Sequence, residues 1–281
     1  MNTYGFIGLG LIGGSLAKMI RKKEPDARII CYSRNKEKLL PAVQDKIIDS
    51  RLTQPGEELG KCDIIFLCTP VLYFEDILFK IKDHISDGQI ITDVGSVKVA
   101  PAEAAKKAGL SASFIGGHPM AGSEKTGYEN SDAELLKGCT YILTPAYDTP
   151  PDSLKRLKGL LTDIGCNISI TTPELHDYAV AGISHLPHLS AVALTETIKK
   201  ADTDDLMMRF AATGFRDTTR IAASSPEVWE QICIANSGNI VKLLDAYIDE
   251  LTSLKNILQS GNGSGINEAF RSAGEYLKKM Q

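Results

Sequence analysis

Residues 4–23 read YGFIGLGLIGGSLAKMIRKK, and this stretch decides the fold of the first half of the chain. An apolar run at residues 4–7 predicts a short strand, and a glycine-rich turn then leads into an amphipathic helix predicted over residues 16–23. Strand, GxGxxG turn and helix in this order predict a dinucleotide-binding βαβ unit. Gly8 would make the tight turn, Gly10 would admit a pyrophosphate, and Gly13 would let the helix pack on the strand.

Strands and helices alternate as far as residue 170, and helices alone follow. Further strands are predicted at residues 28–32, 63–68, 89–92, 113–115, 139–143 and 167–170. The later helices are predicted at residues 173–200, 203–212, 226–258 and 266–279. We therefore expect an α/β Rossmann-type, doubly wound sheet over residues 1–170 and an all-α helical domain over residues 171–281. The 226–258 segment is too long for a lone surface helix, which favours a homodimer formed through the helical domain.

The end of the second predicted strand bears on the choice of dinucleotide. NAD enzymes usually place Asp or Glu there to bind the ribose 2′-hydroxyl, whereas this chain has Ser33 and Arg34. A hydroxyl and a guanidinium fit a 2′-phosphate, although Arg34 would equally suit stacking on adenine or exposure to solvent. Both NAD and NADP therefore stay open as the cofactor.

The other cofactor contacts are expected where parallel strands end, because open α/β sheets bind ligands at that edge. Thr69 and Pro70 follow the strand at residues 63–68. The full set of candidate dinucleotide contacts is Gly8, Gly10, Leu11, Ile12, Gly13, Ser33, Arg34, Thr69 and Pro70.

A single histidine stands in the stretch GGHPMAGSE, residues 116–124. An alcohol that is oxidised by hydride transfer must also lose its hydroxyl proton, and an imidazole suits that task near neutral pH. Glycines beside His118 would let the backbone bring the ring close to substrate and cofactor. His118 is therefore the candidate catalytic base.

Ser96 follows another predicted strand, in the sequence DVGS. Its hydroxyl is a candidate donor to the substrate or to the nicotinamide amide. The alternative is that Ser96 is the N-cap of a helix that begins at Val97.

The predicted helical part begins with SHLPH, in which His185 and His188 share a helix face and Pro187 predicts a kink. No third ligand is spaced for a metal, so we expect no metal site. The histidines would instead be satisfied at a domain interface, or His188 would line the active site. His84 and His176 are expected to be surface or capping residues.

Arg216 and Arg220 lie four residues apart in GFRDTTRIA. The planar guanidinium suits carboxylates, so we expect at least one of the two to anchor an anionic substrate. Trp229, the only tryptophan, is expected in the core or at an interface.

Composition narrows the class of protein. The 281 residues are 43% hydrophobic and 23% charged, with a formal net charge of −4 and scattered basic residues, which argues against nucleic-acid binding. Six cysteines occur singly without CxxC spacing, as expected of free thiols in the cytoplasm. No apolar run approaches the roughly 20 residues of a membrane span. We expect a cytoplasmic enzyme with a small-molecule substrate.

Together these motifs resemble the prephenate dehydrogenase family. The resemblance rests on GLGLIGGS from Gly8, DVGSVK from Asp93, GGHPMAGSEKTG from Gly116, SHLPH from Ser184 and GFRDTTRIA from Gly214. It implies a Rossmann domain followed by a helical dimerisation domain. It also implies NAD(P)-dependent oxidative decarboxylation of prephenate to 4-hydroxyphenylpyruvate, a step of tyrosine biosynthesis.

The resemblance also implies roles for single residues. His118 would accept the proton of the C4 hydroxyl, and Ser96 would be a second polar partner near that hydroxyl. Arg220 would clamp a substrate carboxylate. Two further residues, Ser123 and Glu124, would shape the substrate pocket, and His188 matches a pocket histidine.

Three alternatives remain beside this interpretation. Arogenate dehydrogenase performs the same chemistry on an amino-acid side chain. A 3-hydroxyacid dehydrogenase of the 6-phosphogluconate type would need a catalytic lysine from the helical part, which offers Lys199 and Lys200 only at the end of its first helix. A non-catalytic dinucleotide sensor would be expected to lack the base and the carboxylate clamp.

Overall fold

The computed structural model describes residues 1–122 and 125–280, so the predicted pocket residues Ser123 and Glu124 lie outside it. The chain divides into two compact units, residues 1–236 and 237–281.

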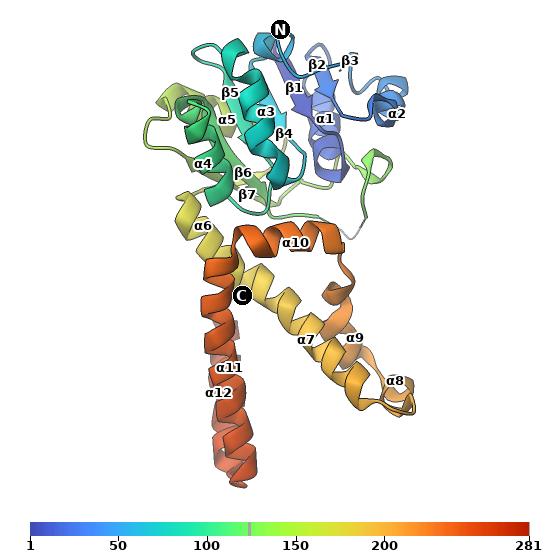
Figure 1. Cartoon of the computed structure of the whole chain (residues 1–281), viewed down its shortest axis with the longest axis vertical. Coiled ribbons are helices and arrows are strands. Elements are labelled where there is room, and N and C mark those ends of the chain that lie inside the picture. Colours follow the sequence, from blue (N-terminus) through green and yellow to red (C-terminus); the bar gives the residue numbers. More distant parts are fainter. Residues whose placement is uncertain (123–124, 281) are drawn as a thin grey trace. The chain divides into compact units, whose positions relative to one another are not determined.

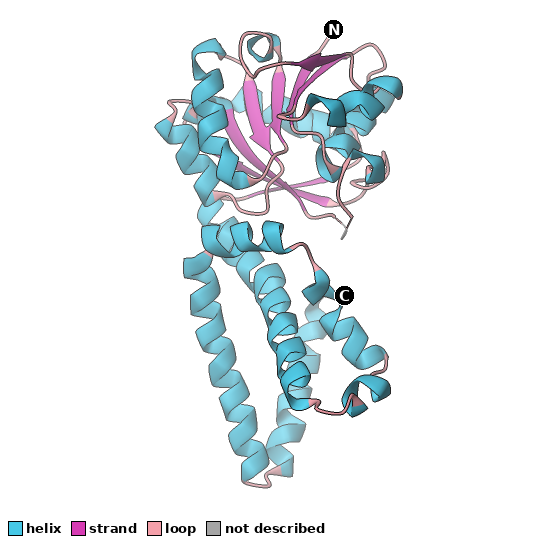
Figure 2. Ribbon diagram, turned by 45° about the vertical axis from the view of Figure 1, so that its right-hand side comes forward, coloured by secondary structure: helices cyan, strands magenta, loops and turns pink. Residues whose placement is uncertain are grey.

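The first unit is built on one eight-stranded sheet, shown in magenta in Figure 2. Its strands are β1 Thr3–Ile7, β2 Arg28–Tyr32, β3 Ser50–Leu52, β4 Ile64–Leu67, β5 Ile90–Asp93, β6 Phe114–Pro119, β7 Thr140–Pro145 and β8 Asn167–Ile170. The spatial order is β3-β2-β1-β4-β5-β6-β7-β8, and every neighbouring pair is parallel except β6 and β7. The order β3-β2-β1-β4-β5-β6 is that of a doubly wound Rossmann sheet, which confirms the predicted fold class.

Helices cover both faces of this sheet (Figure 1). They are α1 Leu11–Lys23, α2 Leu40–Gln44, α3 Phe74–Ile81, α4 Val99–Lys107 and α5 Pro151–Asp163. Successive strand residues point to opposite faces, so Phe6 joins the apolar cluster with α1 and α5, whereas Ile7 joins the cluster with α3 and α4. Both clusters are buried, which explains why the central strands are almost continuously apolar.

The helical part that follows is more broken than the sequence predicts. The first unit continues with α6 Pro173–Val180, a π-helical turn Ala181–His185, α7 Leu186–Ala201, α8 Leu206–Phe210, α9 Thr213–Thr219 and α10 Pro226–Ala235. The expected continuous helix over residues 226–258 is wrong, because α10 ends at Ala235. Asn236 leaves helical geometry at φ −117° and ψ 24°, and its side-chain amide donates to the Asp177 carbonyl at 2.7 Å.

The second unit is a pair of helices, α11 Ser237–Gln259 and α12 Gly263–Leu277. Both leave large apolar side chains in solvent, among them Ile248, Leu251, Leu258, Phe270 and Tyr276. Over the described part of the chain, no helix combines the length and the apolar character needed to cross a membrane.

Strand β6 packs so closely between β5 and β7 that its glycines have no room for a side chain. A Cβ atom on Gly117 would lie 2.6 Å from the backbone oxygen of Asp93 and 3.0 Å from the ring of Tyr141. Backbone atoms of a central sheet cannot move aside cheaply, so the glycine is required by packing.

We therefore expect Gly117→Ala to lower the free energy of unfolding by about 1–3 kcal/mol, the usual range for overpacking. Urea denaturation followed by circular dichroism measures this. The matched control is Gly159→Ala on the exposed face of α5, where no atom lies within 4 Å of the added Cβ. That change should instead stabilise the protein by about 0.5–1 kcal/mol, the helical preference of alanine over glycine. Equal effects of the two substitutions would contradict the packing argument.

Candidate active site

The glycine-rich loop lies where the order of strands reverses, between β1 and β4, the place where doubly wound sheets bind ligands. Gly8 has φ +86°, and a Cβ there would meet the Cys68 carbonyl oxygen at 2.9 Å. A Cβ on Gly13 would lie 2.9 Å from the Cys68 Cβ. In contrast, no atom lies within 4 Å of a Cβ on Gly10, so this position faces open space. Gly8 and Gly13 thus pack against Cys68 at the end of β4, whereas Gly10 faces open space.

Helix α1 begins directly at this open position. It starts at Leu11 with Gly10 as its N-cap, five residues earlier than the apolar pattern predicts, and its first turn contains no acidic residue. The N–H groups of a helix start together with the helix dipole attract an anion such as a diphosphate. Within the same part of the helix, Gly14 lets α1 approach Ser131, whose hydroxyl would lie 2.7 Å from an added Cβ.

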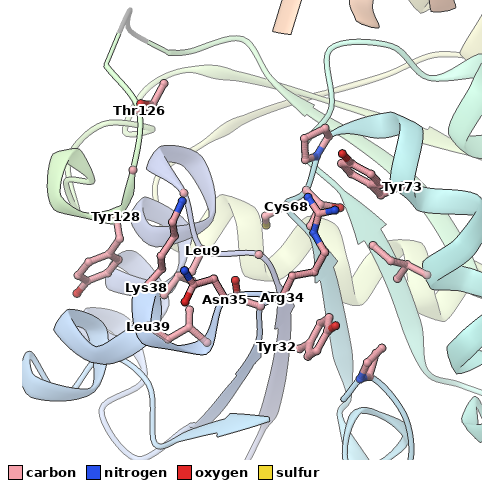
Figure 3. Close-up of a pocket in the computed structure, with 18 of the residues that line it drawn as sticks. Leu9, Tyr32, Arg34, Asn35, Lys38, Leu39, Cys68, Tyr73, Thr126 and Tyr128 are labelled. Carbon is pink, nitrogen blue, oxygen red and sulfur yellow. The ribbon is translucent and has the colours of Figure 1, made fainter. Parts of the chain in front are cut away.

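A cavity of about 660 Å³ opens beside the loop (Figure 3). Six of the nine predicted dinucleotide contacts line it, namely Gly8, Gly10, Ser33, Arg34, Thr69 and Pro70. Leu11, Ile12 and Gly13 belong to α1 and are not among its lining residues. The Thr69 hydroxyl is buried, and the described residues offer it no hydrogen-bond partner. The unpartnered Thr69 hydroxyl, the open space at Gly10 and the helix start without acidic residues together fit a dinucleotide. That each of the nine residues contacts the dinucleotide remains our prediction.

His118 on β6 is the first member of a chain of three side chains. Its Nδ1 lies 2.8 Å from Nε2 of His176, and Nδ1 of His176 lies 2.7 Å from Oδ1 of Asp177. The side chains of His176 and Asp177 are 0% and 1% exposed, whereas His118 is half-buried. The expectation that His176 is a surface or capping residue is therefore wrong, because α6 packs it under β6.

The Asp177 carboxylate also holds the start of α4. Its Oδ1 accepts the N–H of Lys98 at 2.7 Å, and its Oδ2 accepts the N–H of Val99 at 3.0 Å. Helix α4 begins at Val99, without any side-chain cap from its own segment. The alternative that Ser96 caps a helix from Val97 is therefore wrong, and Asp177 takes that place from a distant element.

A buried ion pair between Lys98 and Asp93 supports the strand that carries His118. Both side chains are fully buried, and Lys98 Nζ also donates to the Gly117 carbonyl at 2.7 Å. The Asp93 carboxylate accepts the N–H groups of Gly117 at 3.0 Å and of Gly95 at 2.8 Å. The pair thus binds both backbone polar groups of Gly117, the residue before His118.

These surroundings keep the imidazoles neutral. Burial holds the pKa of His118 well below its ordinary value, and the nearby Lys98 charge lowers it further. Burial also lowers the pKa of His185 to about 4, against a smaller opposing effect of Asp177. Burial lowers the pKa of His188 as well, and Arg220 contributes to this shift.

The remaining predicted residues lie on other elements. Ser96 is half-buried between β5 and α4, His188 stacks on Trp229 with ring centroids 3.8 Å apart, and His188 Nδ1 lies 2.8 Å from the Ser184 carbonyl oxygen. Arg220 lines a second cavity, of about 840 Å³, together with Arg216 and residues of α7 to α9. A smaller cavity next to it holds His188 and Trp229. None of these three cavities contains His118, so a role shared by His118 and Arg220 stays a prediction.

Sequence reasoning overlooked His176, Asp177, Lys98 and Asp93 as parts of the site. The pair His176-Asp177 lies in the first helix after the α/β part, and the motif DVGSVK contains both Asp93 and Lys98. An acid and a lysine five residues apart, across the end of a buried strand, were the signal that could have suggested a buried pair.

Models of one protein family match most of the chain. Residues 16–170 match the model "Prephenate dehydrogenase, nucleotide-binding domain", and residues 172–272 match "Prephenate dehydrogenase, dimerization domain". The prephenate dehydrogenase of Bacillus subtilis is 34% identical over 98% of this chain and 75% of its own length.

Two solved structures are similar over nearly their whole length. A Synechocystis arogenate dehydrogenase has a TM-score of 0.88 and 33% identity, covering 99% of this chain and all of its own. A prephenate dehydrogenase from A. aeolicus, in complex with hydroxyphenyl propionate and NAD+, has a TM-score of 0.87 and 34% identity. That match covers all of this chain and 96% of the other.

The lowered pKa of His185 predicts how stability depends on pH. In the unfolded chain this imidazole takes up a proton near pH 6.5, but in the folded chain only near pH 4. Between these values the unfolded state binds more protons, so the free energy of unfolding should fall as pH falls from 6.5 to 4. In His185→Gln the slope should be smaller by up to about 1.4 kcal/mol per pH unit.

Urea denaturation at several pH values measures these slopes, and His84→Gln, at an exposed histidine, is the control that should keep the wild-type slope. An unchanged slope in His185→Gln would show that this imidazole does not titrate below its ordinary range.

Proposed function

Because this chain belongs to the prephenate dehydrogenase family, we propose that it catalyses the NAD(P)-dependent oxidative decarboxylation of prephenate to 4-hydroxyphenylpyruvate. The glycine-rich loop and the residues after β2 would hold the dinucleotide, which would supply the hydride acceptor for C4 of the cyclohexadiene ring. The C4 hydroxyl gives its proton to the protein, the ring carboxylate leaves as carbon dioxide, and the proton returns to the phenolate oxygen that this forms. Aromatisation of the ring drives the reaction. The observation that carries this proposal is the hydrogen-bonded chain His118–His176–Asp177.

The hydrogen bonds of this chain determine which nitrogen of His118 is basic. A carboxylate only accepts, so the proton in the His176–Asp177 contact is on His176 Nδ1. With this proton on Nδ1, the tautomer that we assign to His176 leaves its Nε2 bare to accept the Nδ1–H of His118. His118 Nε2 is left without a proton and is ready to accept the one from the substrate hydroxyl. His176 and Asp177 thus act as positioning residues for the base.

Burial supports the same role for His118. Its pKa lies well below the ordinary value, so the imidazole is unprotonated throughout the neutral range. A base with a lowered pKa is always available but accepts the proton less strongly, and the loss of carbon dioxide compensates because it makes the overall reaction favourable.

The substrate carries two carboxylates, and guanidinium groups suit them. We assign a substrate carboxylate to Arg220, which lies near enough to His188 to lower the pKa of that imidazole. Ser96 is assigned to the region of the C4 hydroxyl, at the C-terminal end of β5. Ser123 and Glu124, by resemblance, would complete the pocket.

Arogenate is the second candidate substrate, because this chain is as similar to the Synechocystis arogenate dehydrogenase as to the A. aeolicus prephenate dehydrogenase. The two substrates differ only in the side chain, which carries a ketone in prephenate and an ammonium group in arogenate. The ring chemistry and the proposed role of His118 are the same for both.

We also propose that residues 1–170 bind the dinucleotide and that residues 171–281 bind substrate and form a homodimer. The match of residues 172–272 to a dimerization domain supports this. The exposed apolar side chains of α11 and α12 support it too, because contiguous apolar surface usually marks an interface. A cytoplasmic location remains our expectation from the cysteine pattern.

The proposed reaction is tested by absorbance at 340 nm, with prephenate and arogenate each offered with NAD and with NADP. Turnover is expected in at least one of the four combinations. In His118→Asn, kcat should fall about 10²–10⁴-fold, as expected when a general base is removed, while dinucleotide binding is retained. His84→Asn is the control at an exposed histidine. Turnover of His118→Asn at the wild-type rate would contradict the assignment of the base.

The positioning role of His176 needs two substitutions. His176→Leu removes the acceptor for His118 Nδ1–H, so kcat should fall roughly 10- to 100-fold as the ring loses its fixed tautomer. His176→Gln should recover most of this loss, because its amide oxygen accepts from His118 while its NH₂ group donates to Asp177. Thermal denaturation and dinucleotide titration check that both variants are folded. If both variants fall equally, or neither does, His176 does not act through the hydrogen bond.

A further inference from the structure

We propose that this chain selects NADP over NAD, binding the adenosine 2′-phosphate with Ser33, Arg34 and Lys38. This inference rests on the proposed function, since it names the cofactor of that reaction. It concerns the adenosine end of the 660 Å³ cavity, where β2 ends beside the glycine-rich loop (Figure 3).

The position that decides between the two dinucleotides is well defined. The Tyr32 carbonyl at the end of β2 accepts the Gly8 N–H at 2.8 Å, so the residues after β2 lie directly beside the fingerprint. A Rossmann enzyme that uses NAD places a carboxylate here to accept hydrogen bonds from the ribose. Ser33, Arg34 and Asn35 provide none.

No acid from the following turn replaces the missing carboxylate. Glu37 is the first acid after β2, but it lies 3.9 Å from Arg51 and does not line the cavity. The Asn35 side-chain oxygen accepts the N–H of Glu37 at 3.1 Å, where it caps the short helix Lys36–Leu39. Among the described residues that directly follow β2, no carboxylate is therefore in place to accept from two ribose hydroxyls.

The adenosine end of the cavity is lined by the cationic side chains of Arg34 and Lys38 instead. The Arg34 guanidinium carbon lies 4.2 Å from the ring centroid of Tyr73, so the aromatic face supports one side of the planar group. Figure 3 shows Arg34 reaching up beside Tyr73, with Lys38 and Asn35 on the other side of the cavity. Among the described residues neither Arg34 nor Lys38 has an ion-pair partner.

The two acids of the cavity do not neutralise these cations. Asp76 on α3 and Glu129 in the turn Tyr128–Asn130 line the same cavity, yet neither forms an ion pair with Arg34 or Lys38 among the described residues. A dianionic phosphate beside Ser33 would accept from its hydroxyl and from Arg34 and would be attracted by the charge of Lys38, and charge-assisted hydrogen bonds are the strong ones.

The test measures binding, so it does not depend on turnover. Fluorescence titration of the purified full chain with NADPH and with NADH should show NADPH bound at least about 10-fold more tightly. Competition isolates the subsite: 2′,5′-ADP should displace NADPH at lower concentration than its isomer 3′,5′-ADP, which has the same charge. Equal displacement by the two isomers, or NADH bound as tightly as NADPH, would overturn the proposal.

Variants assign the residues. Arg34→Ala should weaken NADPH binding about 10- to 100-fold and leave NADH nearly unchanged. Ser33→Asp should reverse the preference, because its carboxylate repels the phosphate and accepts from the ribose hydroxyls. Lys36→Ala is the matched control, an exposed lysine of the same short helix that does not line the cavity. If Arg34→Ala weakens both dinucleotides equally, Arg34 serves the adenine or the fold and the proposal fails.

The outcomes separate this proposal from the proposed reaction. Selective NADPH binding without oxidation of prephenate or arogenate would support the 2′-phosphate subsite and overturn the reaction. Oxidation that is faster with NAD, with NADH bound more tightly, would support the reaction and overturn the subsite. If neither dinucleotide binds, both are overturned.

Discussion

The Asp177 carboxylate is the contact on which the rest of the site depends. It accepts the first two free N–H groups of α4 and the Nδ1–H of His176, while the Asp177 carbonyl accepts from Asn236 where α10 ends. One residue therefore joins the α/β part, the first helix after it and, through His176, the His118 side chain. A carboxylate is required, because only an acceptor satisfies two helix N–H groups and sets the tautomer of a histidine chain.

The buried pair of Asp93 and Lys98 is a second constraint, and its purpose is placement more than stability. The cost of removing both charges from water largely offsets their attraction, so a buried ion pair alone is weak evidence of stabilisation. Here the pair uses its remaining hydrogen bonds on Gly95, just after β5, and on Gly117 within β6. The same lysine charge lowers the pKa of His118. Lys98 therefore both fixes the backbone of β6 and lowers the pKa of the histidine that β6 carries.

The parts of the site that could be predicted from the sequence depend on local spacing. The glycine turn, the histidine proposed as the base and the missing acid after β2 can each be recognised within a few residues of chain. His176 could not be assigned, because its partner lies 58 residues earlier and only the packing of α6 under β6 brings them together. The break at Asn236 has the same origin, since the hydrogen bond to the Asp177 carbonyl spans 59 residues and overrides an otherwise helical pattern. Local propensity has no access to such contacts.

The lowered basicity of the histidines has a consequence for how a charged substrate orients itself. His118, His185 and His188 all have pKa values below their ordinary range, so this imidazole-rich region carries little imidazolium charge at neutral pH. In the proposed site, an approaching carboxylate is therefore not attracted by the imidazoles and is drawn toward guanidinium groups. A hydroxyl, in contrast, can donate to an unprotonated imidazole nitrogen. In the proposed substrate site, the low charge at the imidazole end would therefore sort the two ends of a dianion without any steric barrier, and a molecule bound the wrong way round would lack this attraction.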